Sequence, residues 1–210
     1  MTACSRPAWG EALLAAGLLL FGAGMSAAGS LTPIELLRRS ERAEHTVPLK
    51  ARRFVTVWRE GRTIASVARF QQAADGSTRL DYEAPREARG RIVSTLGGRQ
   101  VQYEPSRRLL RETPAPLASL PTRAPSQLLL RNYRLVVAPK REMAGGHICL
   151  RLDILPRTAG KGSQRRWIDE RTFRCLRQET RFPDGSLSQV VELREVQYGA
   201  GVTAADLEIR

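Results

Sequence analysis

The chain has 210 residues, enough for one domain with a hydrophobic core, and its 42% of apolar residues argues against disorder and against a multispan membrane protein. Its 34 lysines and arginines outnumber 21 acidic residues, which gives a formal net charge of +13. With three cysteines and two histidines, the chain has too few ligands for a structural zinc site of the usual spacing.

The amino terminus has the pattern of a secretory signal peptide. Arg6 precedes an apolar run from Ala12 to Met25, and small residues follow at 26–29. This run is shorter than the roughly 20 residues that a membrane-spanning helix needs. We therefore predict a signal peptide over residues 1–28 and an exported, soluble, periplasmic chain over 29–210. An uncleaved membrane anchor is the alternative, because Glu11 is unusual in such a leader.

One helix is predicted to open the mature chain, and strands are predicted to follow it. Thr32 is placed to cap the helix, Pro33 fits its first turn, and Glu35 occupies the capping-box position, so we expect a helix up to about Glu44. Beyond Pro48, short runs rich in β-branched and aromatic residues alternate with turn pairs, which predicts successive hairpins. The clearest strand alternates apolar with other residues over 148–154.

A proline-rich segment interrupts this series. Four prolines make residues 114–125 an extended loop that cannot be a central strand, residues 126–132 are predicted to form a short helix, and strands resume at Tyr133. No fixed repeat and no long linker divides the chain. These patterns predict a single α+β domain with a large antiparallel sheet and two or three helices.

Cysteine and histidine chemistry is predicted to be absent. If residues 147–156, 164–170 and 173–182 form a three-stranded meander, Cys149 and Cys175 lie on its two outer strands. Their Cα atoms would then be about 9.6 Å apart across the strands, whereas a disulfide needs Cα atoms within about 7 Å, so no disulfide is expected. His147 and Cys149 share a strand face, but no third group that would orient a catalytic pair is evident. Nucleophile-elbow, phosphate-loop and zinc-protease motifs are missing. We therefore predict no enzyme, no catalytic residue, no metal and no cofactor.

The arginines suggest an anionic partner. Between Arg86 and Arg111 seven arginines face only Glu87 and Glu104, and within this segment Arg89, Arg91, Arg107 and Arg108 are the candidate contacts. A solvated surface is the simpler reading of such charge runs. Attraction to phospholipid headgroups, to an acidic glycolipid or to an acidic protein segment is the sharper one. Nucleic acid is not expected, because an exported protein meets little of it.

Aromatic residues are spaced about one to a strand. A sheet that curls without closing would turn some of them toward a concave apolar face, which is a natural cavity for an acyl chain. The candidate residues of this cavity are Phe54, Trp58, Phe70, Tyr82, Tyr103 and Trp167.

The order of these elements resembles one protein family. It is the periplasmic half-barrel group of the lipoprotein carrier LolA and the N-terminal domain of the sigma-E regulators RseB and MucB, and the resemblance covers roughly residues 31–198. The resemblance rests on three stretches of sequence. They are residues 128–133, the strand that follows Gly145-Gly146-His147, and the hairpin with Trp167-Ile168-Asp169, Leu176-Arg177-Gln178-Glu179 and Asp184-Gly185. The resemblance implies an open half-barrel: a large curled antiparallel sheet with an N-terminal helix and one or two short helices packed on or in its concave side.

The resemblance implies two functions. The first is an exported carrier that holds lipid or lipoprotein acyl chains on the concave face, with an arginine-rich rim for anionic groups. The second is a regulatory module that docks an acidic segment of a membrane anti-sigma factor or sensor. We expect a monomer with peripheral contact to the membrane surface. Only twelve residues follow Tyr198, so regulation that requires the additional C-terminal domain of the sigma-E regulators is not expected.

Overall fold

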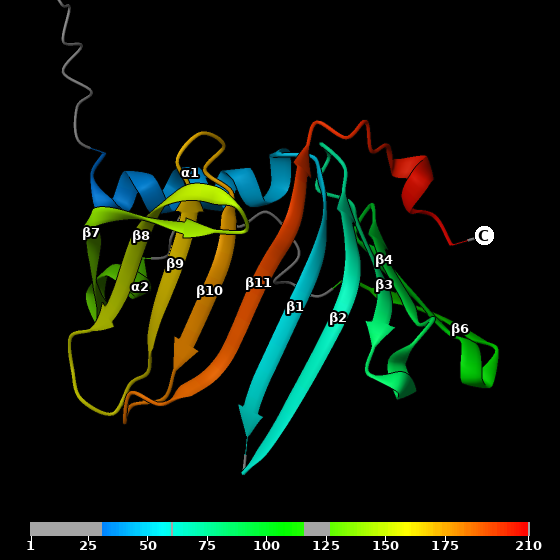
Figure 1. Ribbon diagram of the computed structural model, residues 1–210, viewed down its shortest axis with the longest axis horizontal. Helices are drawn as coiled ribbons and strands as arrows, with labels where there is room; N and C mark the ends of the chain where they lie inside the picture. The colour runs from blue at the N-terminus through cyan, green and yellow to red at the C-terminus, as the bar shows by residue number, and fades with distance from the viewer. Residues whose placement is uncertain (1–30, 60, 116–126, 210) are drawn as a thin grey trace, which may run out of the picture. The chain divides into compact units, whose positions relative to one another are not determined.

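The computed structural model describes residues 31–59, 61–115 and 127–209, and these residues belong to one compact unit. The predicted signal peptide and most of the proline-rich loop lie outside the described residues. Eleven strands form one antiparallel sheet, and its order is β6-β5-β4-β3-β2-β1-β11-β10-β9-β8-β7 (Figure 1). The predicted fold class is confirmed: this is an α+β fold with a large, open, curled sheet.

The sheet consists of two meanders. The first meander comprises β1 (Leu49–Arg59), β2 (Arg62–Gln72), β3 (Thr78–Ala84), β4 (Ile92–Leu96), β5 (Arg99–Glu104) and β6 (Leu109–Pro114). The second comprises β7 (Tyr133–Ala144), β8 (His147–Pro156), β9 (Ser163–Asp169), β10 (Cys175–Arg181) and β11 (Leu187–Tyr198). Pairing between β1 and β11 joins the two meanders at the centre. The predicted strand at 147–156 is confirmed to the residue.

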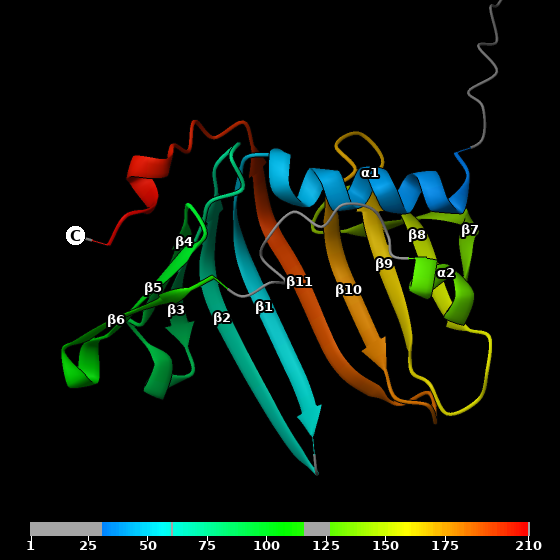
Figure 2. The same cartoon turned by 180° about the vertical axis from the view of Figure 1, so that it is seen from behind.

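Helix α1 (Pro33–Thr46) lies across one face of the sheet, which we call the inner face (Figure 2). It begins as predicted, because the Thr32 hydroxyl accepts a hydrogen bond from the Glu35 N–H at 3.3 Å. Leu36 and Leu37 are fully buried and pack with Leu152, Ile154 and Ile168 of β8 and β9. Burial of this apolar stripe is what holds the helix against the sheet.

The hairpin tip of β7 and β8 crosses the opposite, outer face (Figure 1). There Ala144 and Cys149 form a buried cluster with Trp167, whose indole N–H donates to Glu142 at 2.6 Å. Gly145 lies close to the sheet: a Cβ at this position would lie 2.5 Å from the carbonyl oxygen of Leu193 in β11. Its φ of +58° is also a conformation that favours glycine. The hairpin therefore bridges the outer face from β8 to β11.

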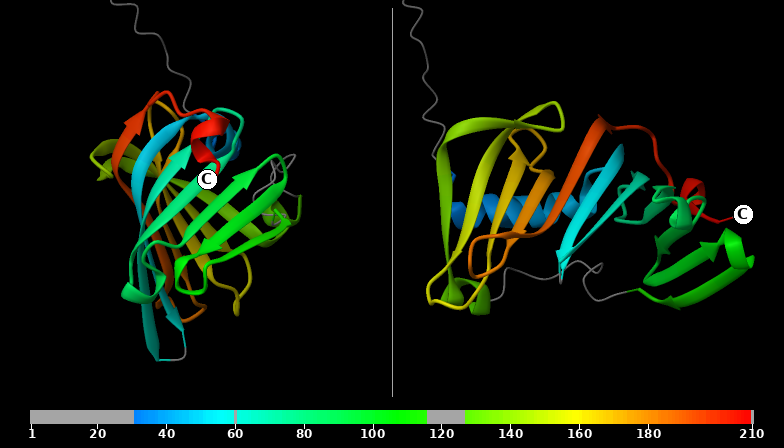
Figure 3. Two further views of the ribbon diagram at one scale, coloured as in Figure 1. Left: turned by 90° about the vertical axis from the view of Figure 1, so that its right-hand side faces the viewer. Right: turned by 60° about the horizontal axis from the view of Figure 1, so that its bottom comes forward.

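The β4–β6 end of the sheet bends toward the side that carries α1 (Figure 3). Strand β6 pairs only with β5, and all of its residues are exposed. The short helices are α2 (Gln127–Asn132), where a helix was predicted, and the 3₁₀ turns η1 (Arg86–Ala88), η2 (Pro105–Arg107) and η4 (Ala204–Leu207). No helix among the described residues is long and apolar enough to cross a membrane.

Candidate ligand-binding cavity

A cavity of about 640 Å³ lies between the end of α1 and the inner face of the sheet. Helix α1 contributes Glu41, Glu44 and His45, and strands from both meanders supply the rest of the wall. Its volume is within the range of about 300–1,000 Å³ typical of sites for one small ligand.

One side of the cavity is apolar because three strands place apolar side chains in register. Phe70 of β2 is opposite Leu80 of β3, and Leu80 is opposite Val93 of β4. All three line the cavity, so they form a continuous apolar row across β2, β3 and β4. Val191 and Leu193 of β11 add apolar surface nearer the centre of the sheet.

Polar side chains make up the remainder of the wall. Gln72, Gln100, Gln178 and Gln189 line it together with Arg53, Arg166, Arg174 and Arg177. Four arginines therefore contribute to the wall, against the two glutamates Glu41 and Glu44. The cavity is thus amphipathic and has an excess of positive charge.

Two of these arginines are already engaged by the protein. Arg174 is only 3% exposed, donates to the Ala43 carbonyl at 3.2 Å and pairs with Glu44 at 3.4 Å, so it fastens the end of α1 to β10. The carbonyl end of a helix favours such a cation. The guanidinium of Arg177 lies 5.0 Å above the Trp167 ring and pairs with Glu179 at 2.7 Å. Both charges are therefore largely satisfied.

Arg53 and Arg166, the other two arginines of the wall, form no ion pair with a described carboxylate. Within the described part of the chain, Arg53 has neither a hydrogen bond nor an ion pair, and Arg166 has only a contact of 3.4 Å to the Gln164 side chain. The Arg166 Nε is buried without a partner. Burial lowers the pKa of Arg53 below its usual value, against the smaller opposing effects of Tyr82 and Glu44. Burial raises the pKa of Glu41, although the charge of Arg166 opposes the shift.

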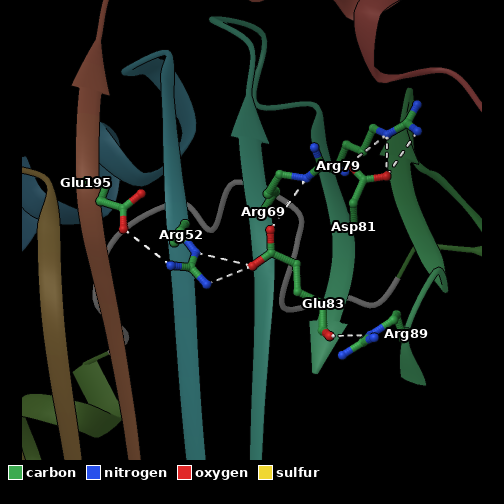
Figure 4. A network of polar contacts seen from close by, with 7 residues as sticks. All are labelled: Arg52, Arg69, Arg79, Asp81, Glu83, Arg89 and Glu195. Atoms are coloured by element: carbon green, nitrogen blue, oxygen red, sulfur yellow. Dashed lines mark hydrogen bonds and ion pairs between the residues drawn. The ribbon is translucent and has the colours of Figure 1, made fainter. Parts of the chain in front are cut away.

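On the outer face, by contrast, arginines form ion pairs with neighbouring carboxylates. Arg52 lies between Glu83 and Glu195, at 2.9 and 3.4 Å, and Arg79 pairs with Asp81 at 3.0 Å (Figure 4). Arg52 is paired across strands and Arg79 along its own strand β3. These pairs neutralise the outer surface locally. Arg53 and Arg166 in the cavity therefore lack an ion pair, whereas Arg52 and Arg79 on the outer face have one.

The six aromatic residues predicted for an acyl-chain cavity are divided between the two faces. Phe70 lines the cavity, and Tyr82 shares the face of Leu80 on β3. Phe54 lies on the outer face beneath Arg52 and Arg194, and Trp58 has the same parity on β1. Tyr103 and Trp167 also belong to the outer face.

The four arginines predicted to meet an anionic partner gather elsewhere, at the ends of β3–β6. Arg89 and Arg91 flank Gly90, whose Cβ position would lie 3.3 Å from Pro105 in the turn that carries Arg107 and Arg108. The Arg89 side chain donates to the Glu83 carbonyl oxygen at 3.3 Å, and Arg91 stacks over Tyr82. Arg107 and Arg108 are exposed and form no ion pair with a described carboxylate. These turns form a second basic surface outside the cavity.

Arg53, Arg166 and Glu41 were not singled out from the sequence. A signal was nevertheless available, because Arg53 alternates in phase with the apolar residues Ala51 and Val55 on one face of β1. An arginine on the apolar face of a half-buried strand is unusual and marks a buried charge.

The Cys–His pair considered from the sequence does not form. The His147 ring faces the buried Asp169 at 3.2 Å, whereas the Cys149 thiol donates to the backbone carbonyl of His147 at 3.6 Å. Asp169 also accepts the N–H groups of Arg171 and Thr172, so it caps the predicted turn. Burial, with a smaller effect of Asp169, raises the pKa of Cys149 to about 12. Such a thiol is a poor nucleophile at neutral pH.

The second described cysteine is separated from the first. Cys175 is opposite Ile168, while Cys149 is opposite Asp169, the next residue along β9. The two thiols therefore project from opposite faces of the sheet with β9 between them, and both are free. No cluster of three or more potential metal ligands occurs among the described residues.

No protein-family model and no curated protein matches the sequence. Solved structures do match it. A chain of the Pseudomonas aeruginosa MucA/MucB complex aligns with a TM-score of 0.62 at 17% identity, over 85% of this chain and 61% of that chain. A crystal structure of MucB gives the same score and identity over 87% and 64%. The fold is that of the matched part of MucB.

The Mycobacterium tuberculosis lipoprotein LppX shares this fold, with a TM-score of 0.51 at 14% identity over 82% of this chain and 97% of LppX. The resemblance to the half-barrel group is thus confirmed at the level of the fold. The aligned region spans less than two thirds of the MucB chains. Proteins with different roles share this fold, so the function must be argued from the cavity itself.

Proposed function

We propose that the protein is an exported binding protein that holds one acyl-bearing amphiphile in the inner-face cavity. The observation that carries this proposal is the amphipathic wall, in which the apolar row of Phe70, Leu80 and Val93 adjoins a cluster of arginines. A ligand with an apolar chain and a polar end matches both parts of such a wall. Export to the periplasm rests on the leader pattern of residues 1–28.

Native mass spectrometry tests this proposal. The full chain is expressed in a cell that exports it, and the mature form is purified without detergent. We expect a stoichiometric lipid or lipoprotein adduct, and intact mass would locate the cleavage site. Leu80→Asp, which puts a charge in the apolar row, should remove the adduct. Met143→Asp is the matched control, because Met143 is 65% exposed on the distant hairpin. A bare wild-type protein, or equal adducts in both variants, would contradict the carrier function.

A regulatory interaction module is the second candidate. It is supported by the fold shared with a chain of the MucA/MucB complex and by the basic turns around Arg107 and Arg108. An acidic segment of a membrane sensor is the partner that this charge would attract.

A fluorescent peptide rich in aspartate and glutamate would test this second candidate by anisotropy. Its affinity should fall between 50 and 200 mM salt, fall again in Arg107→Gln/Arg108→Gln, and survive Leu80→Asp. Equal affinity of the wild type and the arginine variant would exclude the basic turns as the docking surface.

A further inference from the structure

Two arginines of the cavity, Arg53 and Arg166, form no ion pair with a described carboxylate. Transfer of a charged group from water to a protein interior is unfavourable unless a partner compensates it. Proteins therefore pair such groups, as the outer face of this sheet does for Arg52 and Arg79. Neither Arg53 nor Arg166 forms an ion pair with a described carboxylate, although Glu44 attracts the first and Glu41 the second from a longer distance, and both arginines line the cavity.

We propose that Arg53 and Arg166 bind the anionic headgroup of the ligand, a phosphate monoester or a carboxylate. This inference rests on the proposed function and assigns the charge of the amphiphile and its direction in the cavity. A planar guanidinium matches the oxygen atoms of both groups in a bidentate manner.

Strand register places the headgroup. Arg166 of β9 is opposite Gln178 of β10, and Gln178 is opposite Val191 of β11. Val191 is in turn opposite Val55, the next residue of β1 on the same face as Arg53. A headgroup above Gln178 and Val191 thus has Arg166 on one side and Arg53 on the other. The Gln178 side chain lines the cavity there and offers a further hydrogen-bond donor.

The acyl chain then has one direction open to it. The apolar row lies on β2, β3 and β4, on the far side of β1 from β10 and β11. A chain that starts above β10 and β11 passes Arg53 and continues over Phe70 toward Val93. Glu41 and Glu44 line the cavity from α1, and Glu44 is engaged by Arg174. Arg177 is likewise engaged by Glu179, so Arg53 and Arg166 outnumber the one remaining carboxyl group of the lining, that of Glu41.

A matched pair of ligands separates the headgroup from the chain. Lysophosphatidic acid and the monoacylglycerol of the same chain length differ only in the phosphate. Isothermal titration calorimetry below the micelle concentration should show at least tenfold tighter binding of lysophosphatidic acid to the wild-type protein. Arg53→Gln and Arg166→Gln should each weaken that binding about tenfold and leave the monoacylglycerol unchanged. Arg53→Lys, which keeps the charge, should retain part of the preference.

Arg52→Gln is the control variant. Arg52 is the chain neighbour of Arg53, carries the same charge and lies on the outer face, so its loss should leave both affinities unchanged. Equal wild-type affinities for the two ligands would overturn the headgroup site and leave the carrier function standing. An equal effect of Arg52→Gln would also overturn it, because long-range charge alone would then explain the preference. If neither ligand binds, the proposed carrier function fails as well.

Discussion

Arg53 shows how the function of one residue can oppose stability. Its guanidinium forms no hydrogen bond or ion pair with a described residue, and burial lowers its pKa despite the attraction of Glu44. A charge of this kind is tolerated in a ligand-free protein at the expense of folding free energy. Binding sites commonly retain such unfavourable groups.

We therefore expect Arg53→Gln to stabilise the ligand-free protein, by on the order of 1 kcal/mol. Urea unfolding followed by circular dichroism would measure this gain. Arg174→Gln is the comparison, because Arg174 bonds to Ala43 and Glu44 and its loss should destabilise the protein. Destabilisation by Arg53→Gln would show that the residue has a structural role instead.

Glu41 should make stability depend on pH. Burial raises its pKa in the folded protein above the ordinary value of 4.5, against the smaller effects of Arg166 and His45. The folded state then holds the proton more tightly than the unfolded chain, so the wild type loses stability as pH rises from 4.5 through the folded-state pKa. The ionised carboxylate would also repel an anionic headgroup.

Glu41→Gln should therefore be more stable than the wild type at pH 7, and the two should converge near pH 4 and below. Thermal unfolding across this pH range would measure the difference. Glu170→Gln should instead be less stable than the wild type at pH 7, because the Arg141 hydrogen bond lowers the pKa of Glu170. A constant difference between Glu41→Gln and the wild type at all pH values would contradict this account.

At the scale of elements, α1 depends on its buried leucines. Leu37 is fully buried against β8 and β9, whereas Leu110 on the edge strand β6 is 59% exposed. We expect Leu37→Ala to lower the free energy of unfolding by about 3 kcal/mol through the cavity that it leaves. Leu110→Ala should change it by less than about 0.5 kcal/mol. Denaturant unfolding of both variants would check this contrast, and similar losses would mean that α1 is not held by its apolar stripe.

The elements themselves could be predicted from sequence, while their faces could not. Capping at Thr32 and the alternation over 148–154 are local signals, and both α1 and β8 lie where these signals put them. Whether Trp167 or Phe70 points toward the helix depends on strand register and on bulges, such as the one between Cys175 and Arg177. A shift of one residue exchanges the two faces. The aromatic residues predicted for one cavity were therefore divided between both sides.

At the scale of the molecule, positive charge is distributed unevenly. The outer face pairs its arginines with neighbouring carboxylates, as around Glu83 and Glu179. Unpaired arginines remain in the cavity and at the turns around Arg107. These arginines contribute to the net charge of +13 and would attract an anionic ligand or an acidic partner.

Only one half of the sheet is covered on both of its faces. Helix α1 and the β7–β8 hairpin cover β8–β11 from both faces, whereas β6 is held by β5 alone. Backbone amides of β5 and β6 should therefore exchange their hydrogens for deuterium well before those of β8–β11, through local opening of the edge. Mass spectrometry of peptic fragments would record the order, and uniform exchange would contradict it. Because the cavity draws its wall from both halves, an amphiphile bound across it should slow exchange in β3 and β4, far from its charged end.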